Sequence, residues 1–210
     1  MGSAPADLIP PRPTIAGLRE VAAACRACEL WRRGTRTVFG EGPAPAAVML
    51  LGEQPGDRED RVGRPFVGPA GKLLDRLLDA SGIDRRTAYL TNVVKHFNWE
   101  PRGKRRIHRR PTKVHVAACR PWLEAELVVV RPTIVVCLGA TAAAALLGRP
   151  VRLAEERGKV FAGPIEPPVL LTAHPSSILR IDDDRARREA FDALVRDLRV
   201  AARRIAAGHV

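Results

Sequence analysis

The sequence lacks any long hydrophobic run. No stretch of about 18 or more apolar residues occurs in its 210 residues, so a membrane-spanning helix is not expected. The N-terminus also lacks the basic segment and apolar stretch that mark a secretory signal. We therefore expect a soluble, cytoplasmic protein with no membrane contact. With 46% hydrophobic residues the chain can bury one substantial core, and its length favours a single domain.

Cysteine is scarce, and the chain holds only Cys25, Cys28, Cys119 and Cys137. In a cytosolic chain of this size, that number argues against a disulfide framework. Cys25 and Cys28 have the spacing that can clamp one metal centre. Cys119 and Cys137, with 17 intervening residues, are either further ligands or small buried hydrophobic residues. Spacing alone leaves the choice between zinc and an iron–sulfur cluster open.

Acidic residues are outnumbered, since 23 Asp and Glu accompany 35 Lys and Arg, for a formal charge of +12. This excess raises the affinity for polyanions and carries no information about the fold. Nucleic acid is the leading partner class, which would place a prokaryotic protein at the nucleoid. Ribosomal or anionic-membrane binding is the alternative that composition leaves open.

Proline is concentrated at the start of the chain, where it occupies four of the first 13 positions. Because proline lacks the backbone donor that regular structure needs, residues 1–13 are predicted to be a flexible leader. The single domain is then expected over residues 14–210.

Short apolar runs alternate with helical patterns along the rest of the chain. The runs predict strands over residues 46–51, 88–94, 133–138 and 169–172. Helices are predicted after residue 13, around residues 73–78, over residues 113–130, after Gly139 and over about residues 183–207. Alternation of this kind implies right-handed crossovers. The expected fold is α/β, a three-layer α/β/α sandwich with a mostly parallel four-stranded central sheet.

Each predicted strand is followed at once by residues suited to a site, namely Glu53 and Gln54, Asn92, Gly139 and His174. Ligands of open α/β sheets bind outside the carboxyl ends of the strands, so these residues should meet along one edge. Each has a plainer explanation when taken singly. Asn92 and His174 can cap turns, and Glu53 can be a solvated carboxylate. Their convergence is what predicts an active site.

Four separated motifs carry a family resemblance. They are Gly52-Glu53-Gln54-Pro55-Gly56, the loop Pro65-Phe66-Val67-Gly68-Pro69-Ala70-Gly71, Thr91-Asn92 and His174-Pro175-Ser176. In this order, over about residues 25–177, they resemble the motifs of iron–sulfur uracil-DNA glycosylases. The resemblance implies a base-excision repair enzyme that acts on uracil-containing DNA, single strands included, as a monomer. It also implies a 4Fe-4S cluster on the four cysteines.

The resemblance implies roles for individual residues as well. Phe66 would stack on uracil, and the Asn92 amide would read N3–H and O4, a pairing that cytosine reverses. His174 would donate to O2 as negative charge develops on the leaving base, and Gln54 would exclude thymine. The other implied contacts are Gly52 and Asp57 with uracil, and Lys104, Arg105, Arg109 and Ser176 with DNA.

One segment departs from the usual bacterial and archaeal pattern. Gly103-Lys104-Arg105-Arg106-Ile107-His108 resembles the signature insertion of the subgroup called uracil-DNA glycosylase X, described as cross-linking itself to the abasic sugar through the final histidine. The matching residue is His108, with Glu53 orienting its imidazole and accepting a proton. Arg106 would hold the loop or a DNA phosphate.

The basic segment has other interpretations too. The cations Arg105, Arg106 and Arg109 are expected to disfavour a charged His108. Without the resemblance, the segment would be a solvated phosphate-binding loop and His108 an incidental member of it. The alternatives are then a glycosylase that turns over and releases its product, or a non-enzymatic metal-containing module that binds nucleic acid.

Overall fold

A parallel sheet forms the centre of the protein. The computed structural model describes residues 5–162 and 166–207, and within them five strands pair in the order β2-β1-β5-β7-β6. The four parallel strands are β1 (Val48–Gly52), β2 (Ala88–Asn92), β5 (Ile134–Leu138) and β7 (Val169–Thr172). These are the four predicted strands, with ends that differ from the prediction by at most two residues. The short β6 (Val160–Phe161) adds an antiparallel edge that no sequence pattern indicated.

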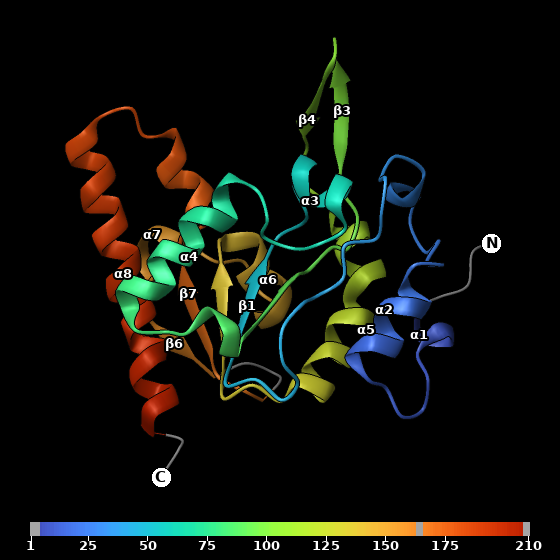
Figure 1. Cartoon of the computed structure of the whole chain (residues 1–210), viewed down its shortest axis with the longest axis horizontal. Coiled ribbons are helices and arrows are strands. Elements are labelled where there is room, and N and C mark those ends of the chain that lie inside the picture. The colour runs from blue at the N-terminus through green and yellow to red at the C-terminus, as the bar shows by residue number, and fades with distance from the viewer. Residues whose placement is uncertain (1–4, 163–165, 208–210) are drawn as a thin grey trace.

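Helices cover both faces of the sheet, which confirms the predicted three layers (Figure 1). Successive strand residues point to opposite faces, so Val48 and Leu50 pack with α4 (Pro69–Ser81) and α8 (Asp184–Ala207). Met49 and Leu51 pack on the other face with α5 (Lys113–Val130) and α6 (Ala140–Leu147). Because both faces are covered, the parallel strands are apolar throughout.

The helix ends follow local chemistry. Pro69 begins α4, where its missing donor costs nothing, and Gly82 ends it in the left-handed conformation. Thr112 caps α5 through its side chain. The shorter elements are α2 (Ile15–Ala22), η1 (Glu29–Arg32), α3 (Asp57–Val62), η2 (Arg85–Thr87), α7 (Leu153–Glu156) and η3 (Pro175–Arg180).

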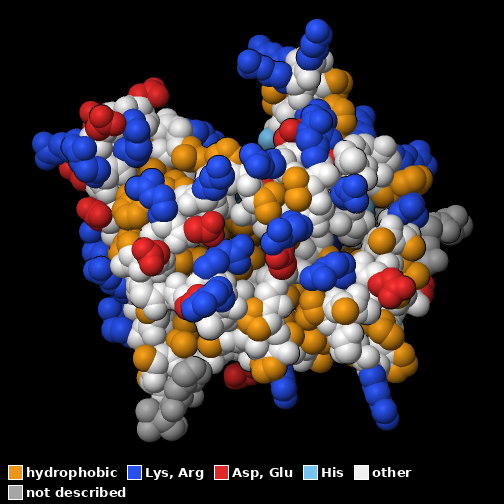
Figure 2. Space-filling model, in the orientation of Figure 1, with side chains coloured by type: hydrophobic (Ala, Val, Ile, Leu, Met, Phe, Trp, Pro, Cys, Tyr) orange, Lys and Arg blue, Asp and Glu red, His pale blue; other side chains and the backbone are white. Residues whose placement is uncertain are grey.

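A two-stranded hairpin stands out from the body of the molecule (Figure 1). It consists of β3 (Trp99–Arg102) and β4 (Arg105–His108), joined by Gly103 and Lys104. The sequence predicts a basic loop here rather than two strands, because Pro101 and a run of cations obscure the strand pattern. The exposed cations at its tip are visible in Figure 2, above a hollow in the surface beside the hairpin.

The described part of the predicted leader includes a one-turn helix, α1 (Pro5–Leu8). Leu8 and Ile9 pack against a small core that includes Leu18 and Trp122. Residues 1–4 lie outside the described residues, as do residues 208–210 of the predicted domain. Within the described ranges, no helix has the length and apolar character needed to cross a bilayer.

Candidate active site

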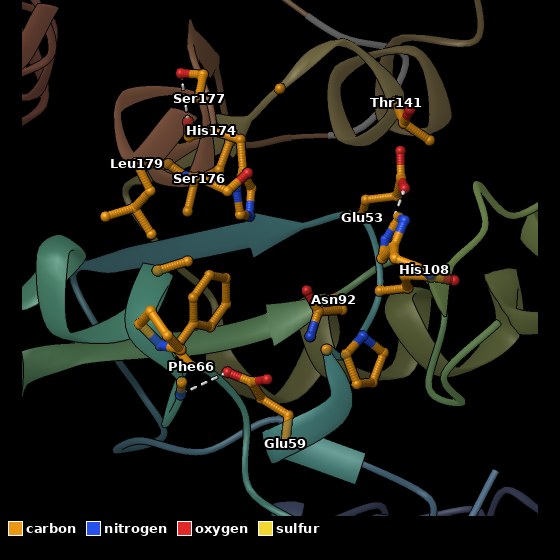
Figure 3. Close-up of a pocket in the computed structure, with 18 of the residues that line it drawn as sticks. Glu53, Glu59, Phe66, Asn92, His108, Thr141, His174, Ser176, Ser177 and Leu179 are labelled. Carbon is orange, nitrogen blue, oxygen red and sulfur yellow. Dashed lines mark hydrogen bonds and ion pairs between the residues drawn. The ribbon is translucent and has the colours of Figure 1, made fainter. Parts of the chain in front are cut away.

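The carboxyl ends of the parallel strands open into one cavity of about 970 Å³. Glu53 and Gln54 follow β1, Asn92 ends β2, Gly139 follows β5 and His174 follows β7, and all five line the cavity. Figure 3 shows Asn92 and His174 on opposite sides of the cavity, and Glu53 beside His108. The predicted convergence at one sheet edge is therefore what the structure contains.

Gly52 lies beside two of the residues that line the cavity, Asn92 and Phe66. Asn92 is 3% exposed and lies next to Gly52, with which it is paired across β1 and β2. A Cβ added to Gly52 would overlap the side-chain oxygen of Asn92 and lie 2.9 Å from Phe66 Cζ. Gly52 itself is not among the residues that line the cavity, but its lack of a side chain leaves room for Asn92 and Phe66, which do line it.

Phe66 is held in an unusual backbone conformation, with a φ of 54°. Such left-handed residues other than glycine are uncommon and are maintained by their surroundings. Gly71 leaves space for the Phe66 carbonyl, and the buried carboxylate of Glu59 accepts from the Gly68 backbone N–H at 2.7 Å. The ring stacks at 27° to the ring of His174, 6.3 Å between centroids. Phe66 therefore presents an aromatic face beside an imidazole.

The surroundings of His174 make its ring a neutral hydrogen-bond donor. Its Nδ1 accepts from the Ser176 backbone N–H at 3.1 Å and contacts Ser176 Oγ at 2.8 Å. An Nδ1 that accepts leaves the proton of the neutral ring on Nε2. Burial lowers the pKa of His174 to about 4, and the nearby Arg180 and His108 contribute to the same shift. At neutral pH the ring can donate from Nε2 without carrying charge.

His108 lies at the edge of the same cavity, on the last residue of β4. Its Nε2 is 3.6 Å from Glu53 Oε1, and its side chain is 52% exposed (Figure 3). The pKa of His108 is lowered, chiefly by burial, with Arg180 and Arg110 adding to the effect and Glu53 opposing it. The expected direction is therefore right. The expected cause, the cations at 105, 106 and 109, is wrong.

Arg106 fastens the hairpin to the body. Its guanidinium donates to Asp57, to Asp60 Oδ2 at 2.6 Å and to the Asp57 carbonyl, and it lies over the rings of Phe97 and Trp99. Only 13% of its side chain is exposed. Of the two expected roles, these contacts favour holding the loop over binding a phosphate. They also pair Asp57, which lines the cavity, with Arg106 and Arg61.

The attachment of Arg106 also positions His108, because the two residues lie on the same face of β4. Residues two apart in a strand share a face, so Arg106 and His108 point the same way from β4. Fixing Arg106 on Asp57 and Asp60 therefore turns His108 toward Glu53.

Gln54 also attaches the hairpin to the body of the protein. Its Nε2 donates to the carbonyls of Asn98 and Arg109 at 3.2 and 2.9 Å, and its Oε1 accepts from the Asn98 N–H at 3.2 Å. These three hydrogen bonds join the Gln54 side-chain amide to Asn98 and Arg109, the residues that flank the hairpin. They hold the Gln54 side chain in place at the edge of the cavity, which it lines, and its expected role of excluding thymine by bulk stays a prediction.

The other predicted DNA contacts are distributed along the rim. Lys104 and Arg105 are exposed at the hairpin tip, whereas Arg109 pairs with Glu100 at 2.6 Å. Ser176 is engaged with His174 and Arg180. Sequence reasoning missed Glu59, Leu179, Arg110 and Arg180, which also line the cavity. Arg180 could have been found, since it lies only six residues after His174, at the end of η3.

The four cysteines come from two neighbouring parts of the core. Cys28, Cys119 and Cys137 belong to one apolar cluster, and Cys25 Sγ accepts from the Trp122 indole N–H at 3.5 Å in the adjoining one. A hydrogen bond from Cys119 lowers the pKa of Cys28 to about 6. Four thiols suit a cubane by chemistry. In the described residues, however, no three potential ligands are gathered around one point, so the structure does not itself form a metal site.

Comparison with known proteins fits this geometry. A sequence model described as the uracil DNA glycosylase superfamily matches residues 39–199. The chain belongs to the uracil-DNA glycosylase superfamily. It is similar to the type-4 uracil-DNA glycosylase of Thermotoga maritima, with 39% identity over 78% of this chain and 82% of that protein.

Two relatives from Pyrobaculum aerophilum show the breadth of the match within the superfamily. The type-4 uracil-DNA glycosylase of that organism is 35% identical over 78% of this chain and 83% of its own length. The type-5 uracil-DNA glycosylase is 31% identical over 64% of this chain and 63% of its own length. The superfamily match covers the whole strand-end cavity, together with Cys119 and Cys137, but begins after Cys25 and Cys28.

Proposed function

We propose that this protein excises uracil from DNA and is then captured covalently by the resulting abasic sugar through His108. The observation that carries the proposal is the shared cavity. It joins an aromatic ring and a buried amide at Phe66 and Asn92, a neutral donor at His174, and an imidazole facing a carboxylate at His108 and Glu53. Excision and capture then use different parts of one site.

Recognition would begin with a nucleotide rotated out of its stack, because the C1′–N1 bond is inaccessible within a duplex. Phe66 offers its ring to the base. The Asn92 amide accepts from uracil N3–H and donates to O4, and cytosine reverses both partners. The close fit of both side chains against Gly52 supports this recognition, since it limits how far either can move.

Base departure would be driven by charge stabilisation. The C1′–N1 bond breaks with both electrons leaving on uracil, and the sugar becomes oxocarbenium-like. A neutral His174 donating from Nε2 to O2 stabilises the developing anion, and preorganised donors of this kind are among the strongest contributors to catalysis. The Ser176 N–H and the low pKa of His174 support this role, because they fix the tautomer and the charge.

Capture would follow at C1′. A lone pair on one ring nitrogen of neutral His108 forms the new C–N bond, and the proton on the nitrogen facing Glu53 passes to that carboxylate. The lowered pKa of His108 supports capture, because only the neutral ring is nucleophilic. The attachment of Arg106 to Asp57 and Asp60 supports it by holding β4 in place before DNA arrives.

The cysteines are proposed to hold a 4Fe-4S cluster with a structural role, tying the segment around Cys25 and Cys28 to α5 and β5. DNA would be held by the exposed cations of the hairpin. Salt-dependent binding is the expected signature of such contacts. We further propose that single-stranded uracil-containing DNA is a substrate, because the open cavity takes a base that is already unstacked.

The test is denaturing electrophoresis after mixing the protein with a uracil-containing oligonucleotide. A retarded band that survives heat and detergent is expected, and it should disappear in His108→Ala while uracil is still released. Arg105→Ala is the comparison variant: it removes an exposed hairpin cation from the other face of β4, so it should weaken DNA binding but still give the band at saturating protein. Mass spectrometry should place the adduct on the peptide that contains His108.

Other results would replace the proposal. Released uracil without a stable band from the unaltered protein would indicate a glycosylase that turns over. Equal binding of uracil-containing and normal DNA with no released base would indicate a non-enzymatic binding module. A band that persists in His108→Ala would mean that another residue is the nucleophile.

A further inference from the structure

A buried ion pair lies directly behind the base-reading residue. The Lys95 ammonium and the Glu126 carboxylate are 2.5 Å apart, and their side chains are 1% and 0% exposed. Lys95 follows β2 by three residues, and Glu126 comes from α5. Neither side chain lines the cavity. The pair therefore has no direct contact with a ligand, yet it is adjacent to the residue that is proposed to read uracil.

The ammonium has a complete set of partners. Lys95 Nζ donates to Glu126 Oε2, to Thr91 Oγ1 at 2.7 Å and to the backbone carbonyl of Asn92 at 2.7 Å. Three donors thus meet three acceptors, which is the full capacity of the group. One of the three bonds holds the peptide of Asn92 itself.

The carboxylate is equally well satisfied. Besides Lys95, it accepts from the Tyr89 hydroxyl at 2.9 Å, the Thr91 hydroxyl at 2.8 Å and the Gly40 backbone N–H at 3.2 Å. A side chain at position 40 would occupy the space of this network. Glu126 consequently fixes Lys95 by joining α5, β2 and the segment before β1.

Stability alone gives little reason for such a pair. Removing two charges from water costs more than their attraction commonly returns, and well-packed apolar residues can replace buried pairs without loss. What apolar residues cannot supply is a donor aimed at the Asn92 carbonyl. On the other side, the N–H groups of Val93 and Val94 bond to the carbonyls of Gly52 and Glu53 at 2.9 and 3.0 Å. The turn after β2 is therefore held both by Lys95 and by backbone hydrogen bonds to the end of β1.

We infer that Lys95 and Glu126 are positioning residues, which hold the Asn92 main chain so that its amide is aligned for the base before DNA binds. The inference rests on the proposed function in one respect, namely that Asn92 reads uracil. It adds that the precision of reading comes from an ion pair outside the cavity.

The test uses the double variant Lys95→Met/Glu126→Gln. It removes both charges together, so that no unpaired charge is buried. The new glutamine amide still offers an oxygen to Tyr89, Thr91 and Gly40, while the Asn92 carbonyl loses its donor. Tyr89→Phe is the matched control, because it removes one bond to Glu126 without touching Asn92. Both variants should unfold at lower temperature than the unaltered protein.

Single-turnover uracil release separates positioning from general destabilisation. The double variant should slow excision about tenfold, whereas Tyr89→Phe should stay within about twofold. In an Asn92→Ala background the same double substitution should slow excision by less than about twofold, because residues that act through a common partner are not additive. Equal fold losses in the two backgrounds would overturn the inference.

A second readout does not depend on catalysis. In ¹⁵N-labelled protein, the side-chain amide signals of Asn92 are assigned by their loss in Asn92→Ala. They should shift or broaden in the double variant and remain in place in Tyr89→Phe. Unchanged signals in the double variant would overturn the inference. Shifted signals in a protein that releases no uracil would support positioning while refuting the proposed function, so the two failures are distinguishable.

Discussion

Adding one methyl group at Gly52 should disable base recognition without unfolding the protein. In Gly52→Ala the new Cβ would overlap the side-chain oxygen of Asn92 and lie 2.9 Å from Phe66 Cζ. A carbon and an oxygen need about 3.3 Å, so the Asn92 amide must retreat by about 1 Å. It cannot do so freely, because Lys95 holds its peptide from behind.

The expected cost follows from that displacement. A misplacement of about 1 Å in a recognising group can cost about a hundredfold in rate, whereas overpacking at a buried site costs about 1–3 kcal/mol of stability. Single-turnover uracil release and thermal unfolding should be measured together. Gly17→Ala is the matched control, because it adds the same methyl group within α2, remote from the cavity. Full excision by folded Gly52→Ala would refute this account of the pocket.

Three further predictions concern charge and metal. Adduct formation should rise with pH, with a midpoint below about pH 6.5, because the pKa of His108 is lowered from the ordinary histidine value. Arg110→Ala should move that profile to higher pH, and an unmoved profile would contradict the assigned cause. The free energy of unfolding should fall as pH drops from about 6.5 toward 4, by up to about 3 kcal/mol for His96, whose pKa burial lowers to about 4. In urea titrations at several pH values, His96→Gln should remove about half of this dependence, because His174, whose pKa is also lowered to about 4, contributes over the same range. Protein purified without oxygen should be brown with about four irons per chain, and Cys137→Ser should lose colour and solubility. Colourless protein with one zinc would exclude the cluster.

The sheet and its site edge could be predicted because their signals are local. Buried parallel strands are continuous apolar runs, as in Val48–Gly52, and the residue after each run falls at the carboxyl edge whatever the rest of the chain does. Helix α5 could be bounded in the same way, since Thr112 caps its start. Asn92 and His174 were thereby placed together from four short segments of sequence.

The parts that were missed depend on contacts between distant segments. Arginine is a residue type that often binds phosphate, and only the fold shows that the guanidinium of Arg106 is already paired with Asp57 and Asp60. Gln54 could be placed at the cavity but not tied to the hairpin ends, 44 and 55 residues away. The low pKa of His108 arises mainly from burial, a property that a run of cations in the sequence does not reveal.

These contacts divide the site into two mechanical parts. The groups proposed for recognition and departure, Asn92 and His174, sit at strand ends and are held by bonds to the body of the protein. The group proposed for capture, His108, sits on a hairpin that is tied down mainly by Arg106 and Gln54. Since side-chain direction in a strand alternates with every residue, a one-residue change of register in β4 would turn His108 away from Glu53 while leaving the strand ends untouched. If His108 captures the sugar as proposed, capture would therefore depend on the hairpin alone, while the groups proposed for base reading and base release would stay the same.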